Sequence, residues 1–325
     1  MAERTAFVTG GSGFIGGRLI RRLVRDGWSV RALARSERSA AAVEAAGADS
    51  VLGNLDNGGA ILDGAGGCDV FFHAAAFVGE WGSRADYERG NVDGTQNAIE
   101  AGYSAGVRRF VHVGTEAALL AGDPLVNVDE TAPLRPDSRA DYARTKARAE
   151  QIVRDFDRLE TVVIRPRLVW GVGDTTILPG VEKAVRAGRF SWIGGGRHRT
   201  STTHVDNVVE GLVLGAERGR PGEAYFVTDG EPVVFREFIT ELLATQGIEV
   251  PDRNAPRAVA GALAAAGETA WRLLPLRGGP PVTRMAFWLS ALETTIDISK
   301  ARRELGYEPV VTRAEGMEEL RRAAG

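Results

Sequence analysis

Short apolar segments alternate with amphipathic ones through the first half of the chain. The apolar segments predict strands over residues 5–9, 28–34, 51–52, 70–74, 110–113 and 162–164. The segments between them predict helices over residues 14–26, 40–46, 84–105 and 142–159, and in the first of these Ile15, Leu19 and Leu23 recur at helical spacing. Because the strands are apolar throughout, we expect an α/β fold with a doubly wound, mostly parallel sheet that helices cover on both faces. Such sheets bind ligands at the carboxyl ends of their strands.

The regular alternation ends near Arg165. Residues 171–199 are rich in glycine and predict loops, whereas residues 204–217 and 224–227 predict one more helix and one more strand. Residues 251–281 mix proline, alanine and glycine, which predicts helices joined by loops. The second half therefore predicts a smaller, mainly helical C-terminal lobe.

Composition narrows the class of protein. The 325 residues carry a net charge of −3, which gives no support for nucleic-acid binding. Cys68 is the only cysteine, so no disulfide forms within the chain. No apolar run reaches the ~18 residues of a transmembrane helix, and Met1–Arg4 leads into the first strand without a signal-peptide pattern. These features predict a cytoplasmic protein.

A glycine-rich loop joins the first strand to the first helix. It reads Gly10, Gly11, Ser12, Gly13, Phe14, Ile15 and Gly16. Glycines at these spacings let the backbone approach a pyrophosphate, which then meets the free N–H groups of the helix N-terminus. We therefore expect residues 1–171 plus about 204–230 to form a dinucleotide-binding Rossmann domain. The substrate-binding lobe would comprise about 172–203 plus 231–325.

The end of the second strand indicates which dinucleotide is bound. An acidic residue there binds the ribose hydroxyl of NAD, whereas an arginine accommodates the 2′-phosphate of NADP. Here the positions are Arg35, Ser36 and Arg38, and Glu37 is the only nearby carboxylate. The alternative is that Arg35 is a solvated surface charge. The pattern favours NADP over NAD.

Tyr142 and Lys146 lie four residues apart at the start of a predicted helix, so they share one face. A tyrosine is a poor acid–base catalyst near neutral pH, and a neighbouring ammonium lowers its pKa. The pair can therefore protonate or deprotonate an alcohol or ketone oxygen. The alternative is an ordinary surface pair.

Together the motifs resemble the extended short-chain dehydrogenases/reductases, the NAD-dependent epimerase/dehydratase-like proteins. The resemblance rests on Thr9–Gly16, His73–Ala76, Asn91–Thr95, Tyr142–Lys146 and Arg165-Pro166. It implies that Tyr142 is the general acid/base and that Lys146 also holds the nicotinamide ribose. Thr115 would bond the reacting oxygen, and Asn91 would lie near the proton relay. A turn cap is the alternative reading for Thr115, and an ordinary helix residue for Asn91.

The same resemblance assigns further cofactor contacts. They are Asn54 and Leu55 at the adenine-contacting turn, Ala74, Ala75 and Ala76 after the fourth strand, and Pro166 beside the nicotinamide. Three positions depart from the usual pattern: Gly114 replaces a serine or threonine, Asn54 an acid and Trp170 a tyrosine. No metal site is expected, because none of His73, His112, His198 and His204 has metal-ligand spacing. His73 and His112 are expected to be structural.

The substrate side is apolar and aromatic, which fits either a packed core or a lipophilic pocket. Residues 280–284, 297–301 and 305–309 resemble the 3β-hydroxysteroid and sterol dehydrogenase branch, which in turn is similar to 2-alkyl-3-oxoalkanoate reductases. The resemblance implies an oxidoreductase that interconverts a secondary alcohol and a ketone on a lipophilic, steroid-like or 3-oxoacyl-like substrate. Two alternatives are a nucleotide-sugar epimerase or dehydratase that retains its cofactor, and a noncatalytic NADP-sensing module. The oligomeric state stays open, a homodimer included.

Overall fold

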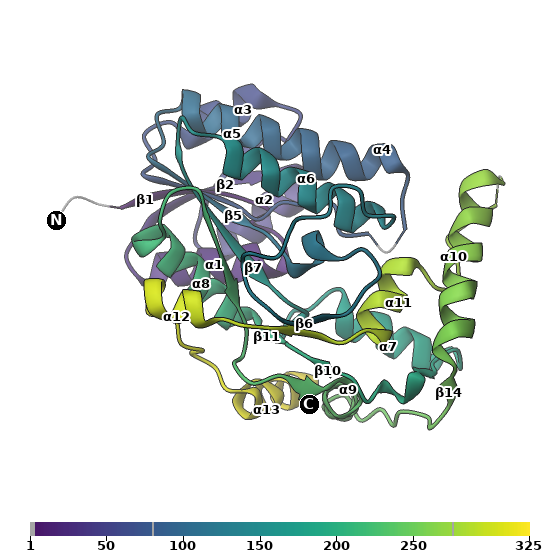
Figure 1. Cartoon of the computed structure of the whole chain (residues 1–325). Coiled ribbons are helices and arrows are strands. Elements are labelled where there is room, and N and C mark those ends of the chain that lie inside the picture. The colour runs from purple at the N-terminus through teal and green to yellow at the C-terminus, as the bar shows by residue number, and fades with distance from the viewer. Residues whose placement is uncertain (1–3, 80, 275) are drawn as a thin grey trace.

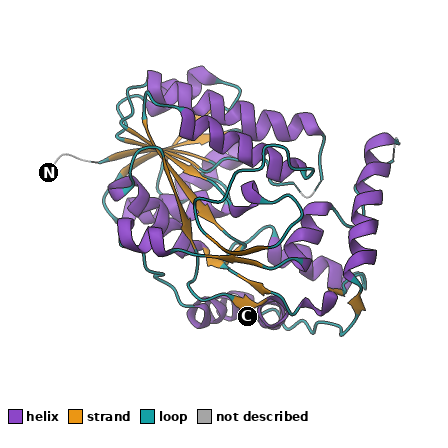
Figure 2. Cartoon of the chain, in the orientation of Figure 1, coloured by secondary structure: helices purple, strands orange, loops and turns teal. Residues whose placement is uncertain are grey.

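A seven-stranded sheet forms the centre of the molecule (Figures 1 and 2). The computed structural model describes residues 4–79, 81–274 and 276–325, so Met1, Ala2 and Glu3, for which a signal-peptide pattern was considered, lie outside the described residues. The strand order is β12-β7-β5-β4-β1-β2-β3, and all its pairings are parallel. The strands are β1 (Thr5–Thr9), β2 (Ser29–Ala34), β3 (Asp49–Leu52), β4 (Val70–His73), β5 (Arg109–Val113), β7 (Glu160–Pro166) and β12 (Glu223–Val227). The predicted doubly wound parallel sheet is confirmed.

Helices cover both faces of this sheet. One face carries α1 (Phe14–Arg25), α2 (Glu37–Ala45), α8 (Val205–Arg218) and α12 (Ser299–Leu305). The other carries α3 (Gly58–Ala65), α5 (Gly94–Ser104) and α6 (Asp141–Asp155). Each face has its own buried apolar cluster, which explains why the strands between them are apolar on both sides.

The predicted helix over residues 84–105 is interrupted. It divides into α4 (Arg84–Tyr87), a π-helix (Glu88–Asp93) and α5. The wider π turn inserts an extra residue, a feature common at functional sites. It places the side chain of Asn91 inside the protein, where only 2% of the residue is exposed.

A second group of elements lies at the carboxyl ends of the strands. It contains a four-stranded sheet, β13 (Val233–Val234), β10 (Arg199–Thr200), β15 (Thr294–Ile296) and β6 (Leu125–Val128). Two further strand pairs are β8 (Val169–Trp170) with β11 (Thr203–His204), and β9 (Trp192–Ile193) with β14 (Asn254–Ala255). The helices are α7 (Ile177–Arg186), α9 (Phe235–Ala244), α10 (Arg257–Leu273), α11 (Arg284–Ala291) and α13 (Arg313–Ala324).

The prediction of loops over residues 171–199 was wrong, because this segment contains α7 and β9. Ile177, Val181 and Val185 recur every four residues, and they pack against the buried cluster around Trp170 and Phe238. Of the glycines that suggested loops, Gly180 lies within this helix and the others lie on either side of it. The proposed division into two domains stays a prediction. Ala301 and Leu305 belong to the segment assigned to the substrate-binding lobe, but they pack with α8 and β12 in the cluster on the central sheet. Within the described residues, no helix is long and apolar enough to cross a membrane.

Candidate active site

The glycine loop has the geometry of an anion site. Gly10 has a φ of +73°, and a Cβ on Gly16 would lie 2.2 Å from the Gly10 carbonyl oxygen, so both positions need glycine. α1 begins after Gly13 without a side-chain cap and without an acidic residue in its first turn. Ser12 and Gly13 are exposed. The free N–H groups at this helix end therefore fit the pyrophosphate of a dinucleotide.

Arg35 and Arg38 lie exposed beyond the end of β2. Neither guanidinium forms a hydrogen bond or ion pair within the part of the chain that the structure describes. Ser36 caps α2, since its hydroxyl accepts the Ser39 N–H at 3.3 Å. Glu37 is exposed in the first turn of the same helix. The two free guanidinium groups fit a 2′-phosphate, whereas the Ser36 hydroxyl is already used as a cap.

The other predicted cofactor contacts lie at neighbouring strand ends. A Cβ on Gly10 would meet the Ala74 carbonyl and the Ala75 nitrogen, so the loops after β1 and β4 touch. Ala74, Ala75 and Ala76 are half-buried in that second loop. After β3, the side chain of Asn54 accepts the Asp56 N–H at 2.9 Å, and Leu55 lies against Gly94 of α5. Pro166 is buried at the end of β7.

Tyr142 and Thr115 meet above the end of β5. Tyr142 lies in the first turn of α6, and its hydroxyl is hydrogen-bonded to the Thr115 side chain. Burial raises the pKa of Tyr142 far above its usual value, the Glu116 carboxylate and Tyr87 raise it further, and the bond to Thr115 opposes them. The sequence predicted a pKa lowered by Lys146. That direction is wrong for this structure, because burial and a carboxylate dominate.

Lys146 points toward the sheet. Its ammonium donates to the Val113 carbonyl at 2.8 Å and lies 3.4 Å from His112 Nε2. Burial lowers the pKa of Lys146 to about 8, although Glu150 opposes this shift. The ammonium is thus held at the carboxyl end of β5, one helical turn from Tyr142.

His73 and His112 form a stacked pair beneath Lys146, with ring centroids 5.4 Å apart. The Thr95 hydroxyl donates to the Asn91 carbonyl, so His73 Nε2 donates to Thr95 at 3.2 Å and His73 Nδ1 accepts the Thr9 hydroxyl at 2.7 Å. Burial and the Lys146 charge lower the pKa of His73 to about 3 and that of His112 well below its usual value. Both rings are therefore neutral core groups that support the strand ends.

Asn91 connects three segments. Its amide oxygen accepts the Phe77 N–H at 2.7 Å, and its amide nitrogen donates to the Phe77 carbonyl and, at 3.0 Å, to Thr145 Oγ1. These bonds hold the loop after β4 against α6. The side chain therefore orients Tyr142 and Lys146 through the helix that carries them.

Sequence reasoning missed a buried ion pair beside Thr115. Glu116 accepts the Thr115 hydroxyl at 2.8 Å, and its other oxygen is paired with Arg167. Arg167 also donates to Thr200 at 3.2 Å. The pair is almost completely buried. The only signal for Glu116 in the sequence was its position next to Thr115. Its partner Arg167 lies 51 positions away, and such a buried pair leaves no local sequence pattern.

An apolar wall lies beside Tyr142. Tyr142 packs in one cluster with Ala117, Leu120 and Ala143 and with α11, which contributes Met285, Phe287 and Trp288. The aromatic residues Phe287 and Trp288 of the C-terminal lobe thus belong to the same apolar cluster as Tyr142. A ketone bound next to Tyr142 would meet a mainly hydrocarbon surface.

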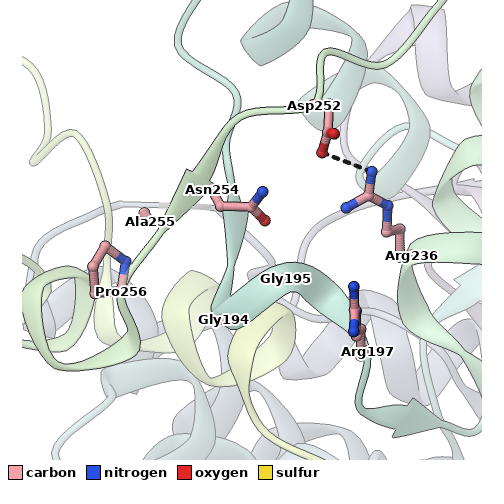
Figure 3. Close-up of a pocket in the computed structure, with 8 residues that line it drawn as sticks. All are labelled: Gly194, Gly195, Arg197, Arg236, Asp252, Asn254, Ala255 and Pro256. Atoms are coloured by element: carbon pink, nitrogen blue, oxygen red, sulfur yellow. Dashed lines mark hydrogen bonds and ion pairs between the residues drawn. The ribbon is translucent and has the colours of Figure 1, made fainter.

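Two other polar features lie away from Tyr142: a surface hollow and a cluster of three titratable side chains. A hollow of about 650 Å³ lies between Arg197, Arg236 and Asn254, and includes none of the predicted site residues (Figure 3). His204, Asp206 and Glu319 come within 4.8 Å of one another, close enough to share a cation. Arg18 lies 3.5 Å from Asp206 and 3.7 Å from Glu319, so a guanidinium already supplies the positive charge.

Comparison with known proteins places this site in context. The model of the 3-beta hydroxysteroid dehydrogenase/isomerase family matches residues 7–257. A 4-hydroxy-2-methyl-3-oxo-4-farnesyl-3,4-dihydroquinoline-1-oxide ketoreductase from Stigmatella aurantiaca is 48% identical over 98% of this chain and 96% of its own length. A 2-alkyl-3-oxoalkanoate reductase from Stenotrophomonas maltophilia (strain K279a) is 36% identical over 97% of each chain.

A solved structure supports the fold. The dTDP-glucose 4,6-dehydratase from Streptomyces venezuelae, with NAD and TYD bound, matches with a TM-score of 0.77 over 98% of this chain and 96% of its own. The two sequences are 24% identical, so this likeness concerns the fold alone.

Proposed function

The chain belongs to the 3-beta hydroxysteroid dehydrogenase/isomerase family of extended short-chain dehydrogenases/reductases, and from that premise we propose that it is an NADPH-dependent ketone reductase with a lipophilic substrate. One observation carries the proposal: the protonated Tyr142, bonded to Thr115, packs in an apolar cluster with α11. A neutral phenol is a proton donor, and the cluster suits a hydrocarbon-rich ketone.

NADPH, when bound, supplies a hydride to the carbonyl carbon. Tyr142 donates its proton to the carbonyl oxygen as the secondary alcohol forms, and solvent returns a proton to the phenolate. The Thr115 hydroxyl accepts the Ala117 N–H and donates to Glu116 in this structure, and it would redirect its proton from Glu116 to the carbonyl oxygen beside Tyr142. Its raised pKa keeps Tyr142 protonated near neutral pH, as the proposed donor of a proton to the carbonyl oxygen must be.

The other site residues act on position and charge. Lys146 would leave the Val113 carbonyl and bind the nicotinamide ribose, and its charge would then stabilise the phenolate. Asn91 would hold the Phe77 loop against α6. The glycine loop Gly10–Gly16 would bind the pyrophosphate, and Ala74, Ala75, Ala76, Asn54, Leu55 and Pro166 would contact the rest of the cofactor.

We assign NADP rather than NAD because the exposed Arg35 and Arg38 have no counter-ions among the described residues. A guanidinium binds a 2′-phosphate with charge-assisted hydrogen bonds but gains little from a hydroxyl. We expect Arg35→Ala to weaken NADPH binding by roughly 10- to 100-fold and NADH binding by less than about twofold. Fluorescence titration of both cofactors measures this.

Arg25→Ala is the matched control, because Arg25 is an exposed arginine at the far end of α1 with one weak ion pair to Asp26. It should leave both affinities unchanged. Tighter binding of NADH than of NADPH by the wild type would show that the cofactor assignment is wrong and would leave the rest of the proposal intact.

The substrate class follows from the apolar wall and from the names of the relatives. The two relatives reduce, by name, a farnesylated quinoline-1-oxide and a 2-alkyl-3-oxoalkanoate. We expect stoichiometric oxidation of NADPH, followed by absorbance, with a farnesylated cyclic ketone, a long-chain 2-alkyl-3-oxoalkanoate or a 3-oxosteroid. Turnover of a nucleotide sugar without net change in the cofactor would contradict the proposed function and favour an epimerase or dehydratase.

A further inference from the structure

The proposed function leaves the charge of the ketone open. A single carbon atom separates the carbonyl of a 3-oxoalkanoate from its carboxylate, whereas a neutral cyclic ketone or a 3-oxosteroid has no charge at that position. When the carbonyl oxygen lies at Tyr142, such a carboxylate must lie in the same part of the pocket. The charges around Tyr142 therefore decide which of these ketones fits.

Glu116 places a negative charge beside the reacting oxygen. The Thr115 hydroxyl is hydrogen-bonded to Tyr142 and donates to Glu116 at 2.8 Å, so a single side chain separates the phenol from the carboxylate. Glu116 is 2% exposed, and water therefore screens its charge only weakly. A substrate carboxylate bound at Tyr142 would face this like charge.

The counter-ion of Glu116 is bound to its other oxygen. Arg167 is paired with that oxygen and also donates to Thr200 at 3.2 Å. The charge of Glu116, but not that of Arg167, contributes to the pKa shift of Tyr142. The carboxylate therefore dominates the electrostatic field at the phenol, although it belongs to an ion pair.

The arginines next to Tyr142 are committed to a protein carboxylate. Asp141 immediately precedes Tyr142 in α6, and only 8% of its side chain is exposed. One of its carboxylate oxygens lies 2.5 Å from a nitrogen of Arg144 and 3.6 Å from a nitrogen of Arg84, and the other is paired with Arg272. A substrate carboxylate would compete with Asp141 for each of these guanidinium groups.

Other described groups around Tyr142 offer little to an anion. The Lys146 ammonium donates to the Val113 carbonyl at 2.8 Å, and the proposed function assigns it to the nicotinamide ribose. The cluster that contains Tyr142 is apolar, with Leu120 and Phe287 among its members. A carboxylate moved from water into such surroundings loses its hydration without gaining a partner, which is strongly unfavourable.

We propose that Glu116 is a specificity-determining residue, which makes the enzyme select ketones that carry no negative charge next to the carbonyl. The substrate class is then a neutral lipophilic ketone, and a 3-oxoacid is accepted only as a neutral derivative such as an ester. This inference rests on the proposed function, because it concerns the ketone that Tyr142 reduces.

A matched pair of substrates tests the proposal. A freshly prepared long-chain 2-alkyl-3-oxoalkanoate and its methyl ester share one carbon skeleton and differ in charge, and NADPH oxidation followed by absorbance gives kcat/KM for each. We expect the wild type to reduce the ester with a kcat/KM at least about tenfold higher than that of the acid. Glu116→Gln should lower this ratio to about threefold or less, mainly through faster reduction of the acid.

The ratio separates charge from other effects of the substitution. A changed pKa of Tyr142 or a lower stability affects both substrates alike, and the wild-type comparison stands even if Glu116→Gln does not fold. Glu160→Gln is the control, because it removes the counter-ion of the buried Arg109 at the opposite end of β5 from Thr115. It should keep the wild-type ratio.

Equal kcat/KM values for acid and ester in the wild type would overturn the proposal. So would a wild-type ratio in Glu116→Gln, which would assign the selectivity to the apolar wall. Reduction of a farnesylated cyclic ketone but of neither 3-oxo compound would overturn it too, because shape and not charge would then select the substrate. Absence of NADPH oxidation with all three ketones and with a 3-oxosteroid would instead contradict the proposed function.

Discussion

At the scale of single residues, the site differs from a simple tyrosine–lysine pair. Tyr142, Lys146 and Thr115 could be predicted because their residue types and spacing are local in sequence. Glu116 and Arg167 could not, because their role depends on burial and on a contact across the fold. Burial raises the pKa of Tyr142 and the Glu116 carboxylate raises it further, so this pair would tune Tyr142 in its proposed role as proton donor.

Glu116→Gln should have two effects. Removal of the negative charge should lower the pKa of Tyr142, so the rate of alcohol oxidation should rise at a lower pH than in the wild type. Arg167 would remain buried without its counter-ion, which costs about 3–5 kcal/mol of unfolding free energy. Urea unfolding and the pH profile of oxidation measure these effects.

Glu160→Gln is the control, because it removes the counter-ion of the buried Arg109 but contributes to the pKa shift of neither Tyr142 nor Lys146. It should lose stability without shifting the oxidation profile. The same shift in both variants would contradict a specific effect of Glu116.

Lys146 gives the site a second pH dependence. Its pKa is lowered to about 8, so it loses its charge as the pH rises through that value. If the ammonium binds the ribose, NADPH affinity should fall between roughly pH 7 and 9. In Lys146→Arg the guanidinium stays protonated, and this step should disappear. A wild-type affinity that is flat over this range would argue against contact between Lys146 and the cofactor.

At the scale of elements, the strands of the central sheet were predictable because burial on both faces makes them continuous apolar runs. α3 and the π-helix were not predicted. α3 begins with Gly58 and Gly59, which are poor helix formers, and the π turn depends on the bonds of Asn91 to Phe77 and Thr145. Such bonds leave no hydrophobic period in the sequence.

The loop that joins β1 to α1 has no room for a larger side chain at Gly16. In Gly16→Ala the added Cβ would lie 2.2 Å from a backbone oxygen, so the loop must shift. We expect a loss of about 1–3 kcal/mol of stability and loss of NADPH binding. Gly58→Ala, whose Cβ meets nothing within 4 Å, should leave both unchanged. Thermal unfolding with and without NADPH checks the pair, and full NADPH binding by Gly16→Ala would refute the loop as a cofactor site.

At the scale of the whole molecule, the second group of elements was predicted only in outline. Its four-stranded sheet brings together segments from Leu125 to Ile296, each of two to four residues. Strands this short have no detectable alternation, and their pairing depends on the folded chain. The helical content could be predicted, whereas the sheet that joins the two halves could not.

The buried histidines should make the whole fold sensitive to acid. Burial lowers the pKa of His73 to about 3 and of His198 to about 4, from an ordinary 6.5, and His112 shifts in the same direction. The unfolded chain therefore takes up protons first, so stability is complete above pH 6.5 and is lost as the pH falls below it. Below pH 6.5, each buried neutral histidine should lower the free energy of unfolding by roughly 1.4 kcal/mol per pH unit.

Urea unfolding at a series of pH values measures this slope. The His198 side chain has no hydrogen-bond partner among the described residues. Its ring stacks on that of Phe235, with the ring centroids 5.0 Å apart. His198→Phe should therefore keep the stacking and remove one histidine's share of the slope. An unchanged slope would show that His198 is not neutral in the fold.

The rate of ketone reduction by Tyr142→Phe tests the central claim most directly. The substitution keeps the ring in its apolar cluster but removes the proton, so kcat should fall at least about 100-fold while NADPH affinity is retained. Tyr225→Phe is the matched control, because Tyr225 is also buried, its hydroxyl donates to Glu304, and it does not contribute to the pKa shift of Tyr142. It should keep a near-normal rate. Near-normal reduction by Tyr142→Phe would contradict the assignment of Tyr142 as the proton donor.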